Sequence, residues 1–127
     1  MKNGKHVILY VDDDQDFLDS VRVILESHGY LVAVASSAEE GLRVYKECRP
    51  DLVIVDLMME EVDAGAHLVK EIMALGNTAP VYMLSSVGDN LNLNTDYSEL
   101  GLAGVFQKPV DPETMLKVIR SKLKPAG

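Results

Sequence analysis

The chain has 127 residues, 47% of them hydrophobic, which suffices for one domain with a sizeable core but leaves no room for a second. Its 20 acidic residues outnumber the 12 basic ones, and the resulting net charge of −8 at pH 7 argues against direct nucleic-acid binding. The single cysteine excludes an intramolecular disulfide, and no Cys and His spacing resembles a zinc site.

Five short apolar runs predict the strands of a buried sheet. Their hydrophobicity is continuous rather than alternating, with Val and Ile prominent, which is typical of parallel strands covered on both faces. In chain order the runs are Val7 to Val11, Leu31 to Ala35, Leu52 to Val55, Val81 to Leu84, and Ala103 to Phe106.

Helical patterns lie between these runs. The first, from Phe17 to His28, has apolar residues at helical spacing, and Gly29 is its candidate C-cap. The second begins with a capping box, in which the Ser37 hydroxyl and the Glu40 carboxylate can satisfy otherwise unpaired backbone amides.

Two further helices are predicted towards the C-terminus. One runs roughly from Ala66 to Leu75 and ends at Gly76, and the last has Asp111 as its N-cap and Pro112 at its first position. The segment from Val87 to Leu100 is rich in Asn and predicts either a poor helix or a loop. Strands that alternate with helices predict an open, doubly wound parallel α/β sheet, because right-handed crossovers place helices on both faces.

Polar side chains follow four of the predicted strands, and ligands of such sheets bind beyond the carboxyl ends of the strands. The residues concerned are Asp12, Asp13 and Asp14 after the first strand, Asp56 after the third, Ser85 after the fourth, and Lys108 after the fifth. Adjacent carboxylates repel one another, and such hard oxygen ligands suit Mg²⁺. The sequence therefore predicts a magnesium site at this edge.

Asp56 is the predicted nucleophile of this site. Its carboxylate would attack phosphorus in line, while Mg²⁺ and the Lys108 ammonium offset the charge of the incoming phosphoryl group. The Ser85 hydroxyl would donate a hydrogen bond to one phosphoryl oxygen.

The sequence resembles the receiver domain of two-component response regulators over almost its whole length. Four motifs together carry the resemblance: Ile8 to Asp13, Pro50 to Asp56, Val81 to Ser86, and Lys108-Pro109. The resemblance implies a flavodoxin-like, five-stranded sheet with strand order 2-1-3-4-5.

The same resemblance assigns a role to each site residue. It makes Asp56 the phosphorylation site, Ser85 the hydroxyl switch and Lys108 the ion-pairing cation. The metal ligands it implies are Asp12, Asp13, Asp56 and the backbone carbonyl of Met58.

The resemblance also implies the protein's partners. Residues 1–127 would form a single receiver domain, with a core of about residues 6–124 and no output domain. We expect a phosphoacceptor rather than a conventional enzyme, which would catalyse its own phosphorylation and slow dephosphorylation. A histidine kinase or histidine phosphotransfer protein would be the donor, a downstream effector protein the target, and a phosphorylation-dependent homodimer a further candidate assembly. The single cysteine fits a reducing compartment, so we expect a cytoplasmic protein. No apolar run approaches the roughly 20 residues that cross a bilayer, so we expect no membrane partner.

Some residues depart from the family pattern. Glu60 replaces a common proline, Ala64 displaces a glycine, and Val105 stands where an aromatic switch residue is usual. A degenerate receiver that binds partners without phosphorylation is therefore an alternative. The apolar Met58 and Val87 flank the acceptor site in the family pattern, which leads to the hypothesis of a long-lived phosphoryl-aspartate.

Two other classes fit less well. A phosphohydrolase of the haloacid dehalogenase type would need a second acid where Met58 stands. A flavodoxin-like electron carrier would need a phosphate-binding loop after the first strand, where the carboxylates of Asp12, Asp13 and Asp14 would repel the phosphate.

Overall fold

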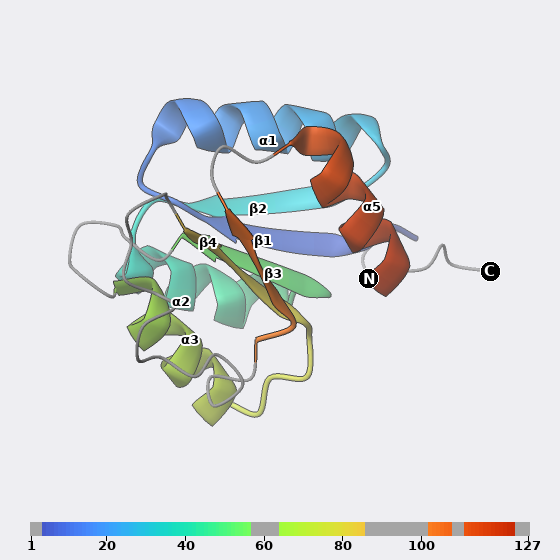
Figure 1. Cartoon of the computed structure of the whole chain (residues 1–127). Coiled ribbons are helices and arrows are strands. Elements are labelled where there is room, and N and C mark those ends of the chain that lie inside the picture. The colour runs from blue at the N-terminus through green and yellow to red at the C-terminus, as the bar shows by residue number, and fades with distance from the viewer. Residues whose placement is uncertain (1–3, 57–63, 86–101, 108–110, 124–127) are drawn as a thin grey trace.

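A computed structural model describes residues 4–56, 64–85, 102–107 and 111–123 of the chain. Strands and helices alternate along most of this part, as Figure 1 shows. In chain order the elements are β1 (Val7–Val11), α1 (Gln15–Ser27), β2 (Leu31–Ala35), α2 (Ala38–Cys48), β3 (Leu52–Asp56), α3 (Ala64–Ala74), β4 (Val81–Ser85), β5 (Gly104–Gln107) and α5 (Pro112–Lys122).

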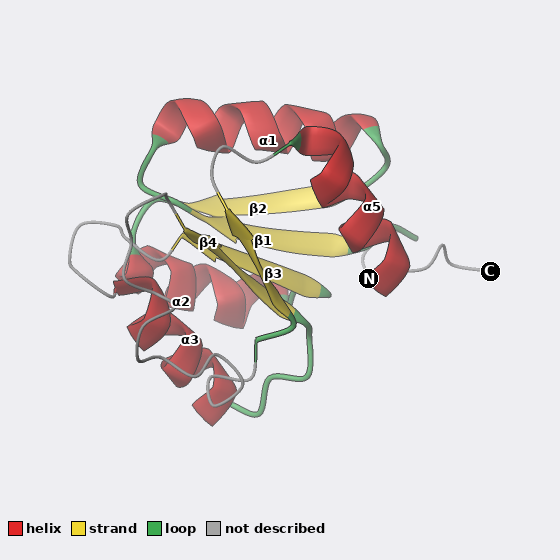
Figure 2. Cartoon of the chain, in the orientation of Figure 1, coloured by secondary structure: helices red, strands yellow, loops and turns green. Residues whose placement is uncertain are grey.

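The strands form one parallel sheet in the order β2-β1-β3-β4-β5. Helices α1 and α5 cover one face of this sheet, and α2 and α3 cover the other (Figure 2). Both the doubly wound fold and the strand order are confirmed. None of the described helices combines the length and the apolar character that a membrane span requires.

The core lies in two layers, one on each face of the sheet. Successive side chains of a strand point to opposite faces, so β1 contributes Ile8 and Tyr10 to the layer under α1 and α5. Its other core residues, Leu9 and Val11, belong to the layer under α2 and α3. All of β1 and β3 is buried, which explains why their sequences are continuously apolar.

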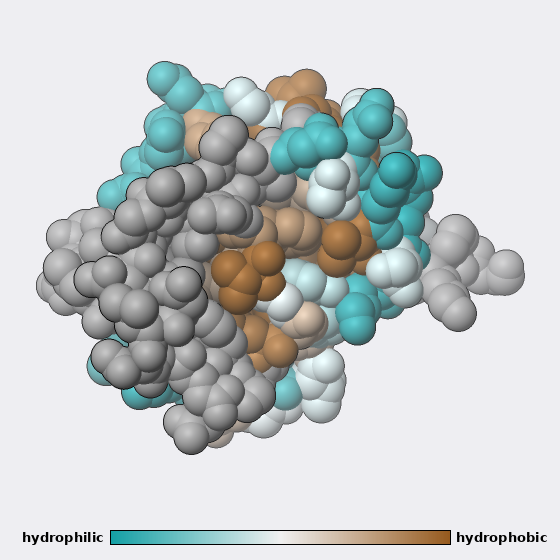
Figure 3. Space-filling model, in the orientation of Figure 1, coloured by the Kyte–Doolittle hydropathy of each residue, from teal (hydrophilic) through white to brown (hydrophobic). Residues whose placement is uncertain are grey.

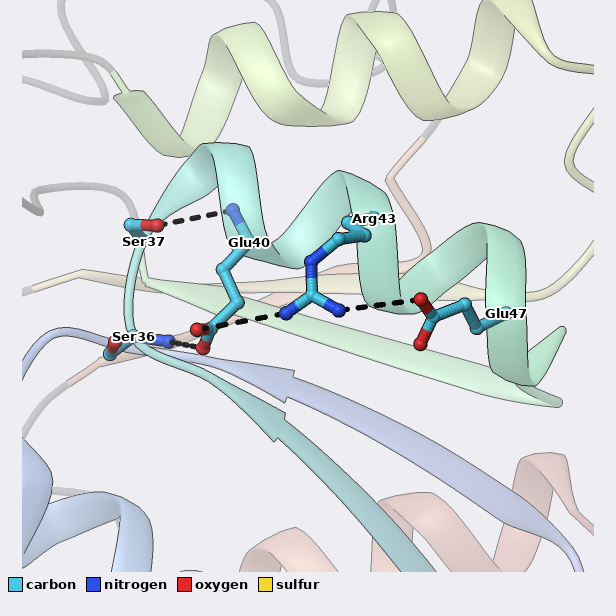
Figure 4. A network of polar contacts seen from close by, with 5 residues as sticks. All are labelled: Ser36, Ser37, Glu40, Arg43 and Glu47. Atoms are coloured by element: carbon cyan, nitrogen blue, oxygen red, sulfur yellow. Dashed lines mark hydrogen bonds and ion pairs between the residues drawn. The ribbon is translucent and has the colours of Figure 1, made fainter.

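The start of α2 has the predicted capping interactions, with one change of partner (Figure 4). The Ser37 hydroxyl accepts a hydrogen bond from the Glu40 amide across 3.1 Å. The Glu40 carboxylate accepts one across 2.8 Å from the amide of Ser36, one residue before the N-cap. Arg43 then lies between Glu40 and Glu47, at 3.9 and 3.3 Å, in exposed ion pairs that contribute little stability.

The other helix ends also follow the sequence signals. Asp14 and Asp111 are the N-caps of α1 and α5, and each accepts a hydrogen bond from a backbone amide of its helix. Gly29 and Gly76 have φ angles of +91° and +86°, the left-handed conformation that follows many helices. The C-cap of α1 itself is His28 rather than Gly29.

Several element bounds differ from the prediction by one or two residues. Helix α1 spans Gln15–Ser27 rather than Phe17 to His28, and β3 and β4 each extend one residue further, to Asp56 and Ser85. Helix α3 begins at Ala64 rather than Ala66, and β5 is shifted by one residue, to Gly104–Gln107. The segment from Val87 to Leu100, predicted as a poor helix or a loop, lies outside the described residues.

Candidate functional site

Two buried aspartates lie side by side at the carboxyl ends of β1 and β3. Val11 and Val55 are register partners in the parallel pair, and Asp12 and Asp56 directly follow them. Asp12 is 0% exposed and Asp56 4%, whereas Asp13 is exposed. One carboxylate oxygen from each of the three residues lies within 4.8 Å of the other two. The register of the central strands thus brings these sequence-predicted acids together.

The Asp12 carboxylate accepts hydrogen bonds on both of its oxygens. The backbone amide of Asp14 donates to Oδ1 across 2.9 Å, and the hydroxyl of Tyr10 donates to Oδ2 across 3.3 Å. Its own amide donates to the Ala35 carbonyl across 3.0 Å, which ties the end of β1 to β2. Asp12 is therefore fixed in both its backbone and its side chain.

Tyr10 is a fully buried residue that contacts the acidic cluster through Asp12. Burial raises the pKa of its phenol far above the ordinary value, and the negative charge of Asp12 raises the pKa further. The hydroxyl consequently keeps its proton at neutral pH and can donate to Asp12. Phe17 packs edge-on against the Tyr10 ring, with the ring centroids 6.2 Å apart.

The three acids fit a hard divalent cation. Carboxylates removed from water are costly unless opposite charge or hydrogen-bond donors compensate them, and here two buried carboxylates and a third are crowded together. Mg²⁺ prefers a small number of such oxygen ligands, completed by waters and phosphate oxygens. Asp12, Asp13 and Asp56 are the described residues that could hold it.

The remaining predicted site residues belong to the neighbouring strands. Ser85 is the last residue of β4, and it follows Leu84, the register partner of Asp56. Gln107 of β5 pairs with Ser85 and directly precedes Lys108 in the sequence. Lys108 and Met58 themselves lie outside the described residues, so their predicted roles stay predictions.

The sequence patterns did not lead us to predict the contact of Tyr10 with the site. Residues two apart on a strand point to the same side, so the spacing of Tyr10 and Asp12 could have revealed it. The approach of the hydroxyl to the carboxylate depends on the bend where β1 ends, which has no sequence signal of its own.

The sequence matches a known family model, that of the response regulator receiver domain, over residues 8–120. Among curated proteins, the transcriptional regulatory protein GlrR of Escherichia coli is 36% identical over 92% of this chain. The alignment covers 26% of that relative, so the chain spans about a quarter of its length.

Solved structures show the same fold. A CheY-like receiver domain protein from Methanospirillum hungatei has a TM-score of 0.84 and 30% identity, with 93% of both chains covered. The chemotaxis protein CheY4 of Vibrio cholerae has a TM-score of 0.83 and 28% identity, with 94% of this chain and 99% of that chain covered. The family match, the strand order and the acidic cluster agree, and this chain belongs to the response regulator receiver domain family.

Proposed function

We propose that this chain is the phosphoacceptor of a two-component phosphorelay, in which Asp56 receives a phosphoryl group in a Mg²⁺-dependent reaction. The observation that carries the proposal is the position of the Asp56 carboxylate. It is almost fully buried at the end of the central strand β3, with oxygens of Asp12 and Asp13 within 4.8 Å.

The transfer would begin at an Asp56 oxygen, which attacks the phosphorus of a phosphohistidine in line. A new P–O bond forms while the P–N bond breaks, and the leaving imidazole takes up a proton. Bound Mg²⁺ would supply positive charge for the phosphoryl oxygens. In the same proposal Asp12, Asp13 and the Met58 carbonyl hold the metal, Lys108 offsets phosphoryl charge, and the Ser85 hydroxyl donates a hydrogen bond.

The partners follow from this chemistry. The donor would be a histidine kinase or a histidine phosphotransfer protein, and the output would pass to a downstream effector protein or to a phosphorylation-dependent homodimer. Receiver domains are signalling phosphoacceptors rather than conventional enzymes, so we expect one transfer per phosphorylation event and slow autodephosphorylation.

Acetyl phosphate provides a test that needs no partner protein. Incubated with acetyl phosphate and MgCl₂, the protein should gain the mass of one phosphoryl group in intact mass spectrometry. The substitution Asp56→Asn should abolish this gain. Asp19→Asn, which makes the same change on the exposed side of α1, should leave it intact. An equal gain in the Asp56→Asn protein would contradict the assignment of the acceptor.

A degenerate receiver remains a second candidate, and one observation favours it. Val105 is 39% exposed on β5, whereas the adjacent Phe106 is buried against the core. Neighbouring residues of a strand point to opposite faces, so Phe106 points into the core while Val105 faces the surface. Phe106 therefore does not lie where an aromatic switch residue at position 105 would lie. Apolar side chains gather around this strand on the face shown in Figure 3. No mass gain in the wild-type protein would favour this candidate.

A further inference from the structure

We propose that Tyr10 is a specificity-determining residue of the metal site, holding the Asp12 carboxylate so that the site favours Mg²⁺ over Ca²⁺. The inference rests on the proposed function, because it concerns the same acidic cluster. Its starting point is the hydrogen bond from the Tyr10 hydroxyl to Asp12 Oδ2, across 3.3 Å.

The two donors bind different oxygens of the Asp12 carboxylate. The Asp14 amide donates to Oδ1 across 2.9 Å, while Tyr10 donates to Oδ2. Asp12 is fully buried, so these contacts fix the orientation of its carboxylate away from bulk water.

Both donors are themselves held in place. The Tyr10 ring is 0% exposed and packs edge-on against Phe17, so the phenol is confined within the core under α1 and α5. Asp14 is the N-cap of α1, and its side chain accepts a hydrogen bond from the Phe17 amide across 3.2 Å. The first turn of α1 therefore supports both of the groups that orient Asp12.

This arrangement affects the two cations differently. Ca²⁺ takes six to eight oxygen ligands and commonly uses both oxygens of a carboxylate. Mg²⁺ demands a tighter, near-octahedral shell and is usually bound by single oxygens of one or two carboxylates. A cation that used both Asp12 oxygens would compete with Tyr10 and Asp14 at once, whereas one that used a single oxygen would compete with one donor only.

A purely structural role for Tyr10 makes a different prediction. Phenylalanine would fill nearly the same volume and keep the edge-on contact with Phe17, so Tyr10→Phe removes the hydroxyl with little change in packing. If Tyr10 only fills the core, this change leaves the relative affinities for the two cations unaltered.

Isothermal titration calorimetry with MgCl₂ and with CaCl₂ measures both affinities. The quantity of interest is the ratio of the Ca²⁺ Kd to the Mg²⁺ Kd, because general changes in site charge largely cancel in it. We expect Tyr10→Phe to lower this ratio about threefold or more, a smaller change than the roughly 10- to 100-fold by which groups that orient metal ligands alter the affinity itself. Tyr82→Phe is the matched control, since Tyr82 is a buried tyrosine of the same core layer, and it should leave the ratio unchanged.

The outcomes separate this inference from the proposed function. Equal ratios in the wild type and a folded Tyr10→Phe protein would overturn the inference and leave the proposed function standing. A wild type that binds no Mg²⁺ would overturn both. If Tyr10→Phe does not fold, ¹³C NMR of tyrosine-labelled wild type decides: the Tyr10 Cζ resonance should move further on saturation with Ca²⁺ than with Mg²⁺. Equal movements would overturn the inference.

Discussion

Asp12 and Asp56 are neighbours because the residues that precede them, Val11 and Val55, are register partners on the adjacent strands β1 and β3. The pairing places two carboxylates in the protein interior, with that of Asp13 close by. Like charges in such a cluster repel one another, and this repulsion opposes folding in the absence of a cation. The same pairing gathers carboxylate oxygens at this edge of the sheet in a set that fits a divalent cation.

Removing the charge of Asp56 should stabilise the metal-free protein. We expect Asp56→Asn to raise the free energy of unfolding in EDTA by on the order of 1 to 3 kcal/mol, because it relieves repulsion in a partly desolvated site. Urea denaturation followed by circular dichroism measures this change. The Asp19→Asn control, at an exposed position, should change the free energy by less than about 0.5 kcal/mol.

Magnesium should reduce the stability advantage of the Asp56→Asn protein. At a Mg²⁺ concentration of about 100 times its Kd, binding should stabilise the wild type by about 2.7 kcal/mol, and the Asp56→Asn protein should gain much less. An Asp56→Asn protein that is less stable than the wild type in EDTA would contradict this account of the acidic cluster.

Tyr45 should stabilise the far end of α2 through its hydroxyl, which donates to Asn77 Oδ1 across 2.7 Å. We expect Tyr45→Phe to lower the free energy of unfolding by about 1 kcal/mol. A double-mutant cycle with Asn77→Ala measures the coupling directly. A coupling energy near zero would show that the contact does not contribute to stability.

The same tyrosine should affect stability at high pH. Burial raises the pKa of the Tyr45 phenol above its ordinary value of 10.0, so the folded state keeps a proton that the unfolded state loses. Its contribution is complete below pH 10.0 and declines as the pH rises from there through the folded-state pKa. Tyr45→Phe should therefore lose stability less steeply than the wild type above this pH, as measured by urea denaturation over a pH series.

Much of the fold and part of the site could be predicted from the sequence. Continuous apolar runs identify buried parallel strands, and carboxyl ends of parallel strands share an edge, so the meeting of Asp12, Asp13 and Asp56 followed from their positions after strands. The N-caps Ser37 and Asp111 were equally clear, because their side chains act on amides within the next few residues.

Two kinds of feature were harder to predict: those with a weak apolar signal, and those that depend on how side chains approach one another in the folded chain. Helix α3 begins at Ala64, which lies four residues before Leu68 and therefore on the same buried side of the helix. A small alanine adds little to a hydrophobic pattern, so the sequence did not indicate this start. The Glu40 carboxylate accepts a hydrogen bond from the Ser36 amide rather than from the Ser37 amide. This change of partner depends on the path of the chain as it enters α2. The Tyr10 contact with Asp12 likewise depends on the geometry beyond the end of β1.

Gly41 allows α2 to approach the sheet and α3 closely. A Cβ atom at this position would lie 3.0 Å from side-chain atoms of both Leu68 and Val11. We expect Gly41→Val to lower the free energy of unfolding by about 1 to 3 kcal/mol, because the larger side chain overpacks the interface. Gly41→Ala should have a smaller effect, since its gain in helix propensity of about 1 kcal/mol offsets part of the strain. Thermal denaturation that ranks Gly41→Val at or above the wild type would contradict this packing argument.

The lifetime of the phosphoryl group gives a prediction from sequence alone. Met58 is apolar at a position that in receivers flanks the phosphoryl group, so it should not orient water for hydrolysis. We expect Met58→Asn to speed dephosphorylation, which loss of radiolabelled phosphate after removal of the donor would measure. Equal rates in the two proteins would show that Met58 does not set the lifetime.

Trapping the phosphorylated residue tests the central claim most directly. Borohydride reduces an aspartyl phosphate to homoserine, and peptide mass spectrometry can then locate the reduced residue. After treatment with acetyl phosphate and Mg²⁺, homoserine should appear at position 56, and omission of Mg²⁺ should greatly reduce its yield. Homoserine at position 12 or 13 in place of 56, or an undiminished yield in EDTA, would contradict the assignment of Asp56 as the metal-dependent phosphoacceptor.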